Sequence, residues 1–390
     1  MIHVLQISTR DPLIARDGRP FGATQGHRMK SVGWLYPSVA AGMVRTLLGE
    51  KKGGKFGPEV IEALKRISIN GPLPTKGSQL FFPAPLDLAI QESAVRAIRN
   101  RIAWASRPHT MDKDEGTDLP SYLLPVLLPS EAEDFKPAKA PPFWSTDRMT
   151  QWLSNSSGAG FEPPPDPDGC TPEGLLALGY LKMEKEERFH VNIEPRTYAA
   201  RETQLFMTVA IAMAEGVSIA LRIETDPAFD SYLLSLDQWT ALGGERRMVR
   251  VAPIEGTGAW ACPSNIRAEL AKTNLVRMVL VTPALFKDGW KPGWIGDHGE
   301  GEFAGVRLQL LGACVERWKP ISGWSYESPR GPKPSLRLAP AGSVYFFQAK
   351  GNASSLADQW LKAVSDLGED GQSRRDGFGL ALWGSWTPHQ

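Results

Sequence analysis

Glycines and arginines stand side by side in two stretches of this sequence, a pairing suited to holding an anion. Near the C-terminus, residues 368–379 read GEDGQSRRDGFG. Glycines permit positive φ and a close backbone approach, and successive amides in such a loop form anion-binding nests. Arg374 and Arg375 supply charge for phosphate, and Phe378 supplies a face for stacking. The alternative is a surface loop that Phe378 anchors to the core.

The second stretch is residues 242–250, which read LGGERRMVR. Its glycines are expected to end a helix, and Arg246, Arg247 and Arg250 then enter a strand. Alternation places Arg246 and Arg250 on one side of that strand and Arg247 on the other. The stretch is therefore either a nucleic-acid contact or a salt-bridged strand edge.

Charged residues also crowd the segment Thr9–Gly33. They are Arg10, Asp11, Arg16, Asp17, Arg19, Arg28 and Lys30. A carboxylate in this segment is expected to orient an arginine rather than to react. His27 is the only histidine here and the best candidate for acid–base cleavage of RNA. No partner base is visible, so a surface histidine is the alternative.

Motifs for catalysis and cofactor binding are absent from the sequence. Residues 49–55 (GEKKGGK) outline a phosphate-binding loop, but Phe56 stands where Ser or Thr must hold magnesium. No His-x-x-x-His, Cys-x-x-Cys or Gly-x-Ser-x-Gly spacing occurs. We therefore expect no enzymatic activity, no cofactor and no metal.

Composition sets broad limits. A chain of 390 residues, 42% hydrophobic and 22% charged, fits two domains with a buried core. The net charge of +1 argues against binding nucleic acid through bulk charge and leaves local basic patches open. No signal peptide and no stretch long enough to span a bilayer is found. We expect a soluble, cytoplasmic protein with no membrane partner.

Hydrophobic periodicity predicts the elements that position these residues. In the first part, strands are expected at His3–Ser8, Ile67–Ile69, Gln79–Phe82, Phe189–Ile193, Leu205–Ile211, Val217–Ile223 and Met248–Ala252, and helices at Ser38–Gly49 and Ser231–Leu242. In the second part, strands are expected at Val276–Val281, Val306–Leu311, Ser343–Phe347 and Phe378–Trp383, with a helix at Ser354–Leu367. The first helix of this second part is weak or replaced by the loop Asp288–Gly301.

The sequence thus predicts an α+β protein of two ferredoxin-like (RRM-like, βαββαβ) domains, residues 1–253 and 254–390. A large Pro-rich insertion, about residues 100–185, interrupts the first domain. Proline lacks the donor that ladders and helices need, so Pro129–Pro172 is expected to be looped. The Gly-rich loop 368–379 lies in the second domain.

An ordered set of motifs runs along the chain. It comprises residues 10–21 (RDPLIARDGRPF), 34–46, 82–87 (FPAPLD), 193–206, 242–247 (LGGERR), 333–334, 340–346 (PAGSVYF) and 371–379. Taken jointly, the set resembles the family of the third subunit of the Cmr (type III-B) CRISPR effector complex, a RAMP protein family. The resemblance covers most of the chain outside about residues 100–185.

This resemblance implies two RAMP domains and a non-catalytic subunit that holds the 5′ repeat-derived handle of the guide RNA (crRNA). It also implies docking to the large polymerase/cyclase-like subunit, next to the backbone RAMP subunit that cleaves target RNA. Three alternatives stay open. They are a RAMP endoribonuclease that processes precursor crRNA through His27, the capping subunit of a type III-A or III-D complex, and a scaffold that contacts protein only.

We expect the RNA handle to be surrounded by arginines, whose forks suit phosphates and guanine edges, and by the Gly-rich loop. The expected RNA-binding residues are Arg16, Arg19, Arg28, Arg45, Arg196, Arg201, Arg246, Arg247, Gly371, Arg374, Arg375, Gly377, Phe378 and Gly379. If about five phosphates are neutralised, log K should fall against log salt with a slope near −3.5, from about −0.7 per contact.

Overall fold

The computed structural model of the chain has a mixed α/β fold with mostly antiparallel sheets. It describes residues 1–16, 28–95, 98–112, 114–132, 134–254, 256, 258–325, 331–368 and 371–389. The chain folds into two compact units, and each unit is made of three separate segments of the sequence. Unit 1 is Met1–Gly77, Met183–Glu255 and Lys319–Arg337, and unit 2 is Ser78–Lys182, Gly256–Trp318 and Leu338–Gln390. This division differs from the consecutive domains expected from the sequence, because Ser78–Lys182 groups with the C-terminal part.

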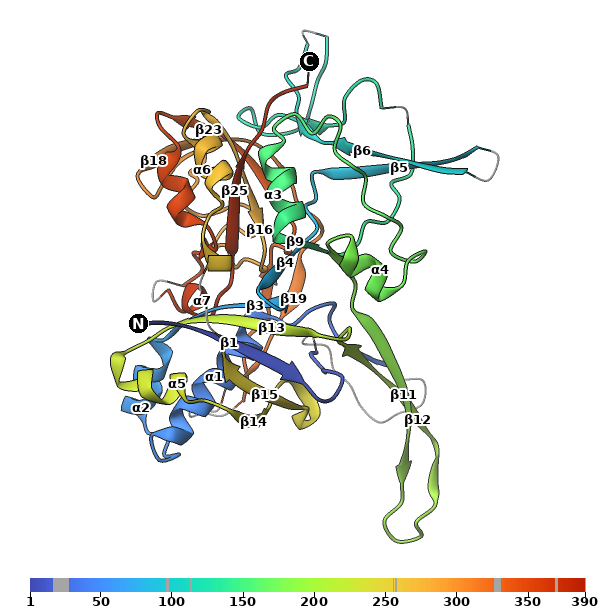
Figure 1. Ribbon diagram of the computed structural model, residues 1–390, viewed down its shortest axis with the longest axis vertical. Coiled ribbons are helices and arrows are strands. Elements are labelled where there is room, and N and C mark those ends of the chain that lie inside the picture. The colour runs from blue at the N-terminus through green and yellow to red at the C-terminus, as the bar shows by residue number, and fades with distance from the viewer. Residues whose placement is uncertain are drawn as a thin grey trace. The chain divides into compact units, whose positions relative to one another are not determined.

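Unit 1 is built around one antiparallel sheet, with a long hairpin beside it (Figure 1). Its strands are β1 (Ile2–Thr9), β2 (Arg28–Lys30), β3 (Ser68–Lys76), β11 (Glu184–Ile193), β12 (Ala200–Ala212), β13 (Val217–Glu224), β14 (Gln238–Ala241), β15 (Met248–Pro253), β19 (Lys319–Ile321), β20 (Trp324–Ser325) and β21 (Gly331–Pro332). Its helices are α1 (Pro37–Lys51), α2 (Pro58–Lys65) and α5 (Asp230–Leu234), with 3₁₀ turns η1 (Pro227–Phe229) and η2 (Gly244–Arg246).

The strands of this sheet lie in the order β3-β13-β1-β15-β14. Along the chain, β1 is followed by α1, then β3, β13, α5 and β15. The four main strands are β1, β3, β13 and β15 in chain order. Across the sheet they lie in the order β3, β13, β1, β15, which is second, third, first, fourth. Strand β1 pairs antiparallel with both β13 and β15, so that Ile7 lies opposite Ile219 and Val251.

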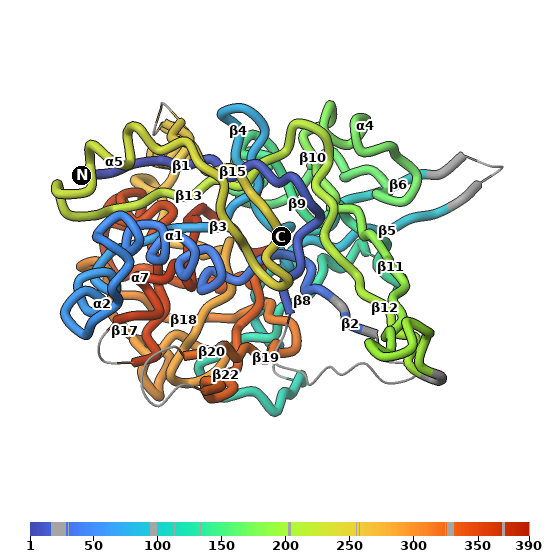
Figure 2. The backbone as a smooth tube through the Cα atoms, turned by 90° about the horizontal axis from the view of Figure 1, so that it is seen from below, coloured from blue at the N-terminus to red at the C-terminus, as the bar shows by residue number. Residues whose placement is uncertain are grey.

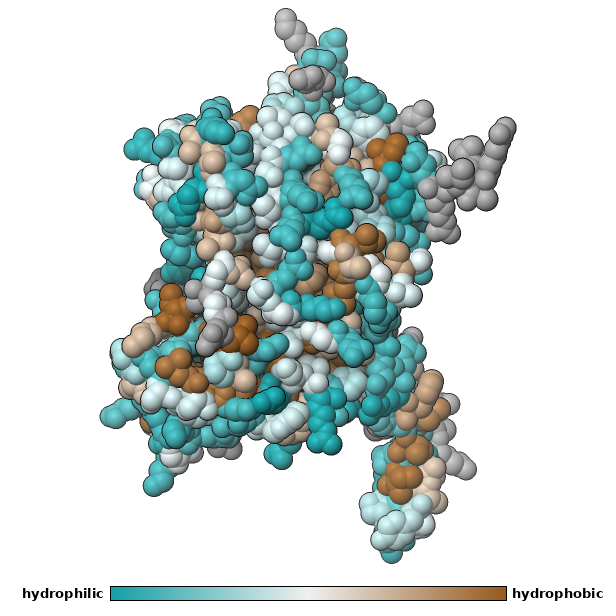
Figure 3. Space-filling model, viewed as in Figure 1, coloured by the Kyte–Doolittle hydropathy of each residue, from teal (hydrophilic) through white to brown (hydrophobic). Residues whose placement is uncertain are grey.

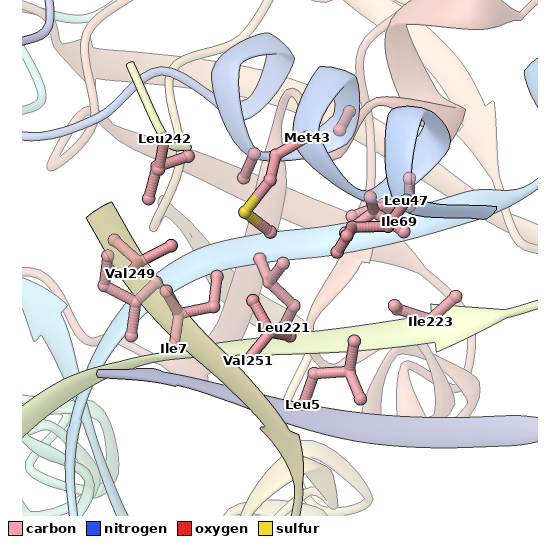
Figure 4. Packing of buried hydrophobic residues seen from close by; sticks show 14 of the residues in the cluster. Leu5, Ile7, Met43, Leu47, Ile69, Leu221, Ile223, Leu242, Val249 and Val251 are labelled. Atoms are coloured by element: carbon pink, nitrogen blue, oxygen red, sulfur yellow. The ribbon is translucent and has the colours of Figure 1, made fainter. Parts of the chain in front are cut away.

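Helix α1 and the sheet share the core of unit 1. The helix begins at Pro37, whose fixed φ suits a first helical turn. Its buried residues recur at helical spacing, and Met43 and Leu47 face apolar side chains of the sheet such as Leu221 (Figure 4). Each large side chain buried this way contributes roughly 1.5–3 kcal/mol. The helix predicted at Ser38–Gly49 is confirmed.

Unit 2 contains a second sheet and most of the segment that the sequence suggested was an insertion. Its strands are β4 (Gln79–Pro83), β5 (Leu88–Val95), β6 (Ile98–Ala105), β7 (Arg107–Pro108), β8 (Val126–Leu127), β9 (Phe143–Ser145), β10 (Tyr180–Leu181), β16 (Leu275–Leu280), β17 (Glu300–Phe303), β18 (Val306–Cys314), β23 (Val344–Lys350), β24 (Lys362–Ala363) and β25 (Leu380–Ser385). Strand β22 (Leu336–Leu338) runs across the unit boundary. The helices are α3 (Thr146–Ser154), α4 (Pro172–Ala177), α6 (Ser264–Leu270) and α7 (Gln372–Arg375), with 3₁₀ turns η3 (Gly258–Trp260) and η4 (Ser354–Gln359). Strands β5 and β6 run side by side as a hairpin (Figure 2).

The second sheet has the order β17-β18-β23-β16-β25-β24. Counted along the chain as β16, β18, β23 and β25, its four main strands again lie in the order second, third, first, fourth. No helix occurs between β16 and β18 in the described residues, and the Gly/Trp-rich segment 288–301 lies there instead, as expected. The two sheets therefore repeat one strand order.

Opposite faces of the second sheet are both covered. Neighbouring residues of a strand point to opposite faces. Trp294, from the segment that replaces the first helix, stacks on Phe347 with ring centroids 5.8 Å apart. On the other face, Arg107 lies 5.7 Å from the Phe346 ring. There α3 packs so closely that a Cβ on Gly384 would lie 2.8 Å from the carbonyl oxygen of Leu153.

A buried charge cluster fixes α3 and the strand β7 to this second face. The Asp87 carboxylate accepts from Nη1 of Arg107 at 2.9 Å and from Nη1 of Arg277 at 2.6 Å, while Trp152 Nε1 donates to its other oxygen at 2.8 Å. All three charged side chains are fully buried. Burial, followed by the nearby charge of Arg277, lowers the pKa of Arg107 to about 10. Such a cluster persists only when every charge is hydrogen-bonded.

Two helix predictions are wrong, and the helices α2, α3, α4, α6 and α7 were not predicted. Within Ser231–Leu242 only α5 is α-helical, and β14 follows it because Trp239 and its neighbours pair with β15. Ser354–Leu367 forms η4 and β24, since Leu361 has φ of 53° and Lys362 pairs with Ala381 of β25. Helix α3 lies inside Pro129–Pro172, which was expected to be looped.

Candidate nucleic-acid interface

Two of the charged segments meet at one end of the unit 1 sheet. The loop after β1 and the turn between β14 and β15 are joined by backbone bonds, Gly244 N to Ile14 O at 2.7 Å and Arg10 N to Met248 O at 3.2 Å. Gly243 has φ of 76°, and a Cβ there would lie 2.4 Å from Ile14 O. The glycine pair is therefore needed for this approach. It ends strand β14, not a helix as expected.

This meeting of segments creates a basic corner, consisting of Arg10, Arg16, Arg246 and Arg247. Arg10, Arg16 and Arg246 are exposed. In the described part of the chain, Arg10 and Arg246 have no carboxylate partner. Arg247 is held by Glu245 at 2.9 Å, and its side chain is only 14% exposed. Among the described residues, the corner therefore offers two guanidinium groups without a carboxylate partner. They lie more than 230 residues apart in the sequence, so a local sequence pattern does not reveal that they meet.

The Arg45 side chain binds backbone carbonyl oxygens of its own unit instead of facing solvent. It lies on α1, half-buried, and its Nε and Nη2 donate to the carbonyl oxygens of Leu64 at 3.0 Å and Ile67 at 3.2 Å. These carbonyls lie at and just beyond the C-terminus of α2, where backbone acceptors lack helical partners. Arg45 therefore fastens α2 to α1, and its predicted RNA contact has no support in this geometry.

Arg196 and Arg201 lie at the far end of the β11–β12 hairpin. Arg196 is exposed in the turn, without a carboxylate partner among the described residues. Arg201 is exposed and forms an ion pair with Glu194 at 2.5 Å. The hairpin is held in register by pairs such as Phe189 with Met207, and β2 pairs in parallel with β12. The structure thus separates these two arginines from the basic corner by the length of the hairpin.

The hairpin also carries apolar side chains in the open, which the sequence analysis did not single out. Phe189 is 71% exposed, and Val191 and Leu205, directly opposite each other, are 42% and 53% exposed. Strand alternation places these three on one face of the hairpin, here called the apolar strip. Figure 3 shows hydrophobic residues gathered along the projecting hairpin. The apolar strip is therefore a candidate surface for contact with another molecule.

The Gly-rich loop 371–379 is folded into unit 2 rather than open to a ligand. Gly371, Gly377 and Gly379 have positive φ of 66°, 91° and 77°. The amides of Gly377, Phe378 and Gly379 donate to the carbonyl oxygens of Arg374, Ser373 and Pro283 at 2.9–3.0 Å. These amides are therefore satisfied within the chain and do not form an anion-binding nest.

Phe378 anchors this loop to the core, which was the alternative reading of its sequence. Its side chain is 3% exposed, so its ring does not face a base. What the loop presents to solvent is the α7 turn. Arg374 is exposed and has no carboxylate partner among the described residues, and Arg375 is half-buried with Nη2 donating to Gln372 at 3.1 Å.

Three predicted positions are not assessed by this geometry. Arg19 and His27 lie outside the described residues, and of Arg28 only the backbone, in β2, is described. Of the remaining arginines, the structure brings Arg16, Arg246 and Arg247 together at the basic corner. Arg374 and Arg375 are neighbours in unit 2. The signal for the corner was present in sequence as two arginine-rich segments, but not their adjacency.

No group of three or more His, Cys, Asp and Glu side chains is arranged to hold a metal ion in the part of the chain that the structure describes. Among the same residues, no helix combines the length and apolar character needed to cross a bilayer.

The family model of the CRISPR-associated protein (Cas_Cmr3) matches residues 5–386. Since this match covers almost the whole chain, the protein belongs to that family. No curated protein matches it.

One solved structure shows a similar fold, and two others are more distant. A chain of the type III-B Cmr-beta bound to cognate target RNA has a TM-score of 0.51 and 12% identity, covering 97% of this chain and 96% of that one. A chain of the Cmr-beta structure bound to cognate target RNA and AMPPnP has a TM-score of 0.47 and 13% identity, covering 88% and 86%. A chain of the Csm3-Csm4 subcomplex of the type III-A interference complex has a TM-score of 0.39 and 12% identity, covering 99% and 100%.

Proposed function

We propose that this chain is a non-catalytic RNA-binding subunit of a type III-B CRISPR (Cmr) effector complex that holds the 5′ repeat-derived handle of the crRNA. The observation that carries the proposal is the basic corner. There, a close backbone approach brings together Arg10 and Arg246, which are exposed and lack carboxylate partners in the described part. Unpaired guanidinium groups at a surface suit phosphate. Membership of the Cas_Cmr3 family supports a role in such an effector.

The same proposal assigns a second surface to assembly. The apolar strip of Phe189, Val191 and Leu205 supports contact with a neighbouring subunit, because exposed contiguous apolar side chains lose their contact with water when a partner packs on them. The partners we propose are the large polymerase/cyclase-like subunit and the backbone RAMP subunit of the complex. The repeated strand order supports reading both sheets as ferredoxin-like RAMP domains.

We further propose a cytoplasmic protein that performs no chemistry of its own. The second candidate function is endoribonuclease processing of precursor crRNA, with His27 as general acid or base. Incubating the purified full-length chain with precursor crRNA separates the two. The binding role predicts an intact precursor for both the unsubstituted chain and His27→Ala. Cleavage that His27→Ala abolishes would replace the binding role by the nuclease.

The proposal is tested by measuring affinity for fluorescein-labelled handle RNA by anisotropy, over a series of salt concentrations. Arg10→Ala combined with Arg246→Ala is expected to weaken binding and to make the slope of log K against log salt shallower by about 1.4, at about 0.7 per lost phosphate contact. The matched control is Arg267→Ala, because Arg267 is exposed in unit 2 but paired with Asp358 at 2.8 Å.

Two results would contradict this assignment. If the unsubstituted chain binds the handle no better than a scrambled RNA and its affinity is independent of salt, the RNA-binding role fails. If the double variant keeps the original slope, the chain binds RNA elsewhere and the basic corner is wrong.

A further inference from the structure

Trp239 is a large aromatic side chain left in the open on a strand. It lies on β14, the last strand of the unit 1 sheet, and is 52% exposed. The α1 side of this sheet is formed by residues such as Leu5, Ile7 and Val249. Strand alternation and the pairing of Trp239 with Arg250 place Trp239 on the opposite face. Trp239 therefore does not belong to the core between α1 and the sheet, and its exposure is not caused by fraying of that core.

The surroundings of Trp239 are polar and include an arginine held by a carboxylate. Directly opposite it, Arg250 donates through Nε and Nη2 to the two Asp237 oxygens, both at 2.6 Å. Ser8 of β1 lies opposite Arg250 on the next strand and is also exposed. The hydrogen bond to Asp237 raises the pKa of Arg250. The planar guanidinium therefore stays charged and is held in one orientation beside the indole.

Trp239 also lies close to the basic corner along the chain. The four-residue strand β14 ends at Ala241, and the glycine turn leads directly to Arg246 and Arg247. Ala241 pairs with Met248, whose carbonyl accepts from the Arg10 amide. The indole thus lies on β14, Arg246 lies in the turn that follows β14, and Arg10 follows β1 and is bonded through its backbone to β15 at Met248.

Two features separate this surface from a protein-docking surface. Across the strands Trp239 pairs with Arg250, which pairs in turn with Ser8, whereas the apolar strip on the hairpin has contiguous large apolar side chains. In addition, β14 is only four residues long and is followed by a left-handed glycine, so it offers little edge for an added peptide strand. An isolated aromatic ring beside an arginine, on the strand that leads to the basic corner, suits the stacking of a base of single-stranded nucleic acid.

We propose that Trp239 stacks on an unpaired base of the RNA whose phosphates the basic corner binds. This inference rests on the proposed RNA-binding function and adds a base-contacting residue to it. Every base presents a π-face, so the contact gives affinity without sequence preference. Arg250, fixed by Asp237, would lie beside the stacked base and define one side of the site.

The test uses the full-length chain, labelled handle RNA and anisotropy at one salt concentration. Trp239→Ala is expected to weaken binding about tenfold, within the range for losing one base–aromatic stack, and Trp239→Phe is expected to retain most of the affinity. Trp290→Ala is the matched control, since Trp290 is 39% exposed in unit 2 near Lys291. Circular dichroism verifies that each variant is folded.

A set of RNAs with a single abasic nucleotide then locates the contact. The inference predicts one position at which removing the base weakens binding of the unsubstituted chain but not of Trp239→Ala. The Trp239 site is overturned if Trp239→Ala binds as tightly as the unsubstituted chain while the Arg10/Arg246 double variant is weakened. It is also overturned if Trp239→Ala leaves RNA affinity intact and only lowers the recovery of neighbouring subunits. If the unsubstituted chain shows no salt-dependent binding of the handle RNA, the proposed function itself is refuted.

Discussion

The two sheets of the molecule share a strand order but differ in what lies on the face opposite their helices or helix substitutes. In unit 1, the part of this face next to β14 is open and carries Ser8, Arg250 and Trp239. In unit 2, the corresponding face is closed by α3, with Arg277 and Phe346 fully buried. The same topology therefore provides a candidate ligand surface in one unit and an internal packing surface in the other.

This difference comes from a few residues. On the second sheet, Gly384 has no side chain and admits the backbone of Leu153, while the central-strand residue Arg277 forms an ion pair with Asp87, which also binds Arg107. On the first sheet, the β15 residue that pairs with Trp239 is Arg250, whose partner Asp237 is itself 55% exposed. The ion pair of Arg277 with Asp87 is therefore buried and supports packing, whereas the ion pair of Arg250 with Asp237 is exposed to water.

The largest expected effect comes from breaking the buried pair. Asp87→Ala leaves two buried guanidinium groups facing each other, and should lower the stability of unit 2 by about 3–5 kcal/mol. Urea unfolding followed by tryptophan fluorescence measures this change. Asp237→Ala, which breaks the exposed pair of the first sheet, is the control and should leave the midpoint almost unchanged. Equal effects of the two substitutions would refute the contrast between the two faces.

A smaller effect is expected from widening the contact between α3 and the second sheet. In Gly384→Ala, the new Cβ meets Leu153 O at 2.8 Å and Leu153 Cβ at 2.9 Å. Overpacking of this kind costs typically about 1–3 kcal/mol, and hydrogen exchange of α3 amides should accelerate. Gly116→Ala in the same unit is the control, because nothing lies within 4 Å of its Cβ position. Unchanged exchange in α3 would show that the helix is not seated as described.

Local patterns predicted the regular parts of both sheets from the sequence. Alternation in β1 and β13 and the stripe of α1 were sufficient, because burial on one face leaves a periodic signal. In the segment predicted as a helix at Ser354–Leu367, Leu356, Trp360 and Leu361 are buried, but the backbone is a 3₁₀ turn and strand β24. There, pairing with β25 overrides helical periodicity.

Other parts of the structure were not predicted. One of them carried a local signal that was overlooked, and the rest depend on contacts between residues far apart in the sequence. Helix α3 carried a local signal, since the Ser145 hydroxyl accepts from Arg148 N and precedes Met149 and Trp152 at helical spacing, but the surrounding prolines concealed it. The basic corner was predicted only as separate segments, because Gly244 meets Ile14 through folding. Trp239 was missed because its segment was assigned to a helix. The buried roles of Phe378 and Arg45 depend on tertiary partners that composition does not reveal.

Unit 2 offers a second candidate RNA contact in the loop before β25, where Arg374 is exposed. Arg374→Ala combined with Arg375→Ala should weaken handle RNA binding by less than about tenfold and make the salt slope shallower by about 0.7, since Arg375 is already partly engaged with Gln372. Lys362→Ala is an exposed control in the same unit. If RNA affinity stays constant while subunit docking weakens, the loop contacts protein, and RNA binding is confined to unit 1.

The smallest effect on RNA is expected at Arg45, and it sharpens the assignment of the open surface. Arg45→Met keeps most of the aliphatic stem but removes the hydrogen bonds to Leu64 and Ile67, so it should destabilise unit 1 by about 1 kcal/mol. Handle RNA affinity and its salt slope should stay unchanged, because the guanidinium is directed at backbone carbonyls of its own unit. A shallower slope in Arg45→Met at full folding would mean that this guanidinium also reaches phosphate. The RNA path would then extend from the basic corner to α1, and the open surface of the first unit would be larger than the face around Trp239.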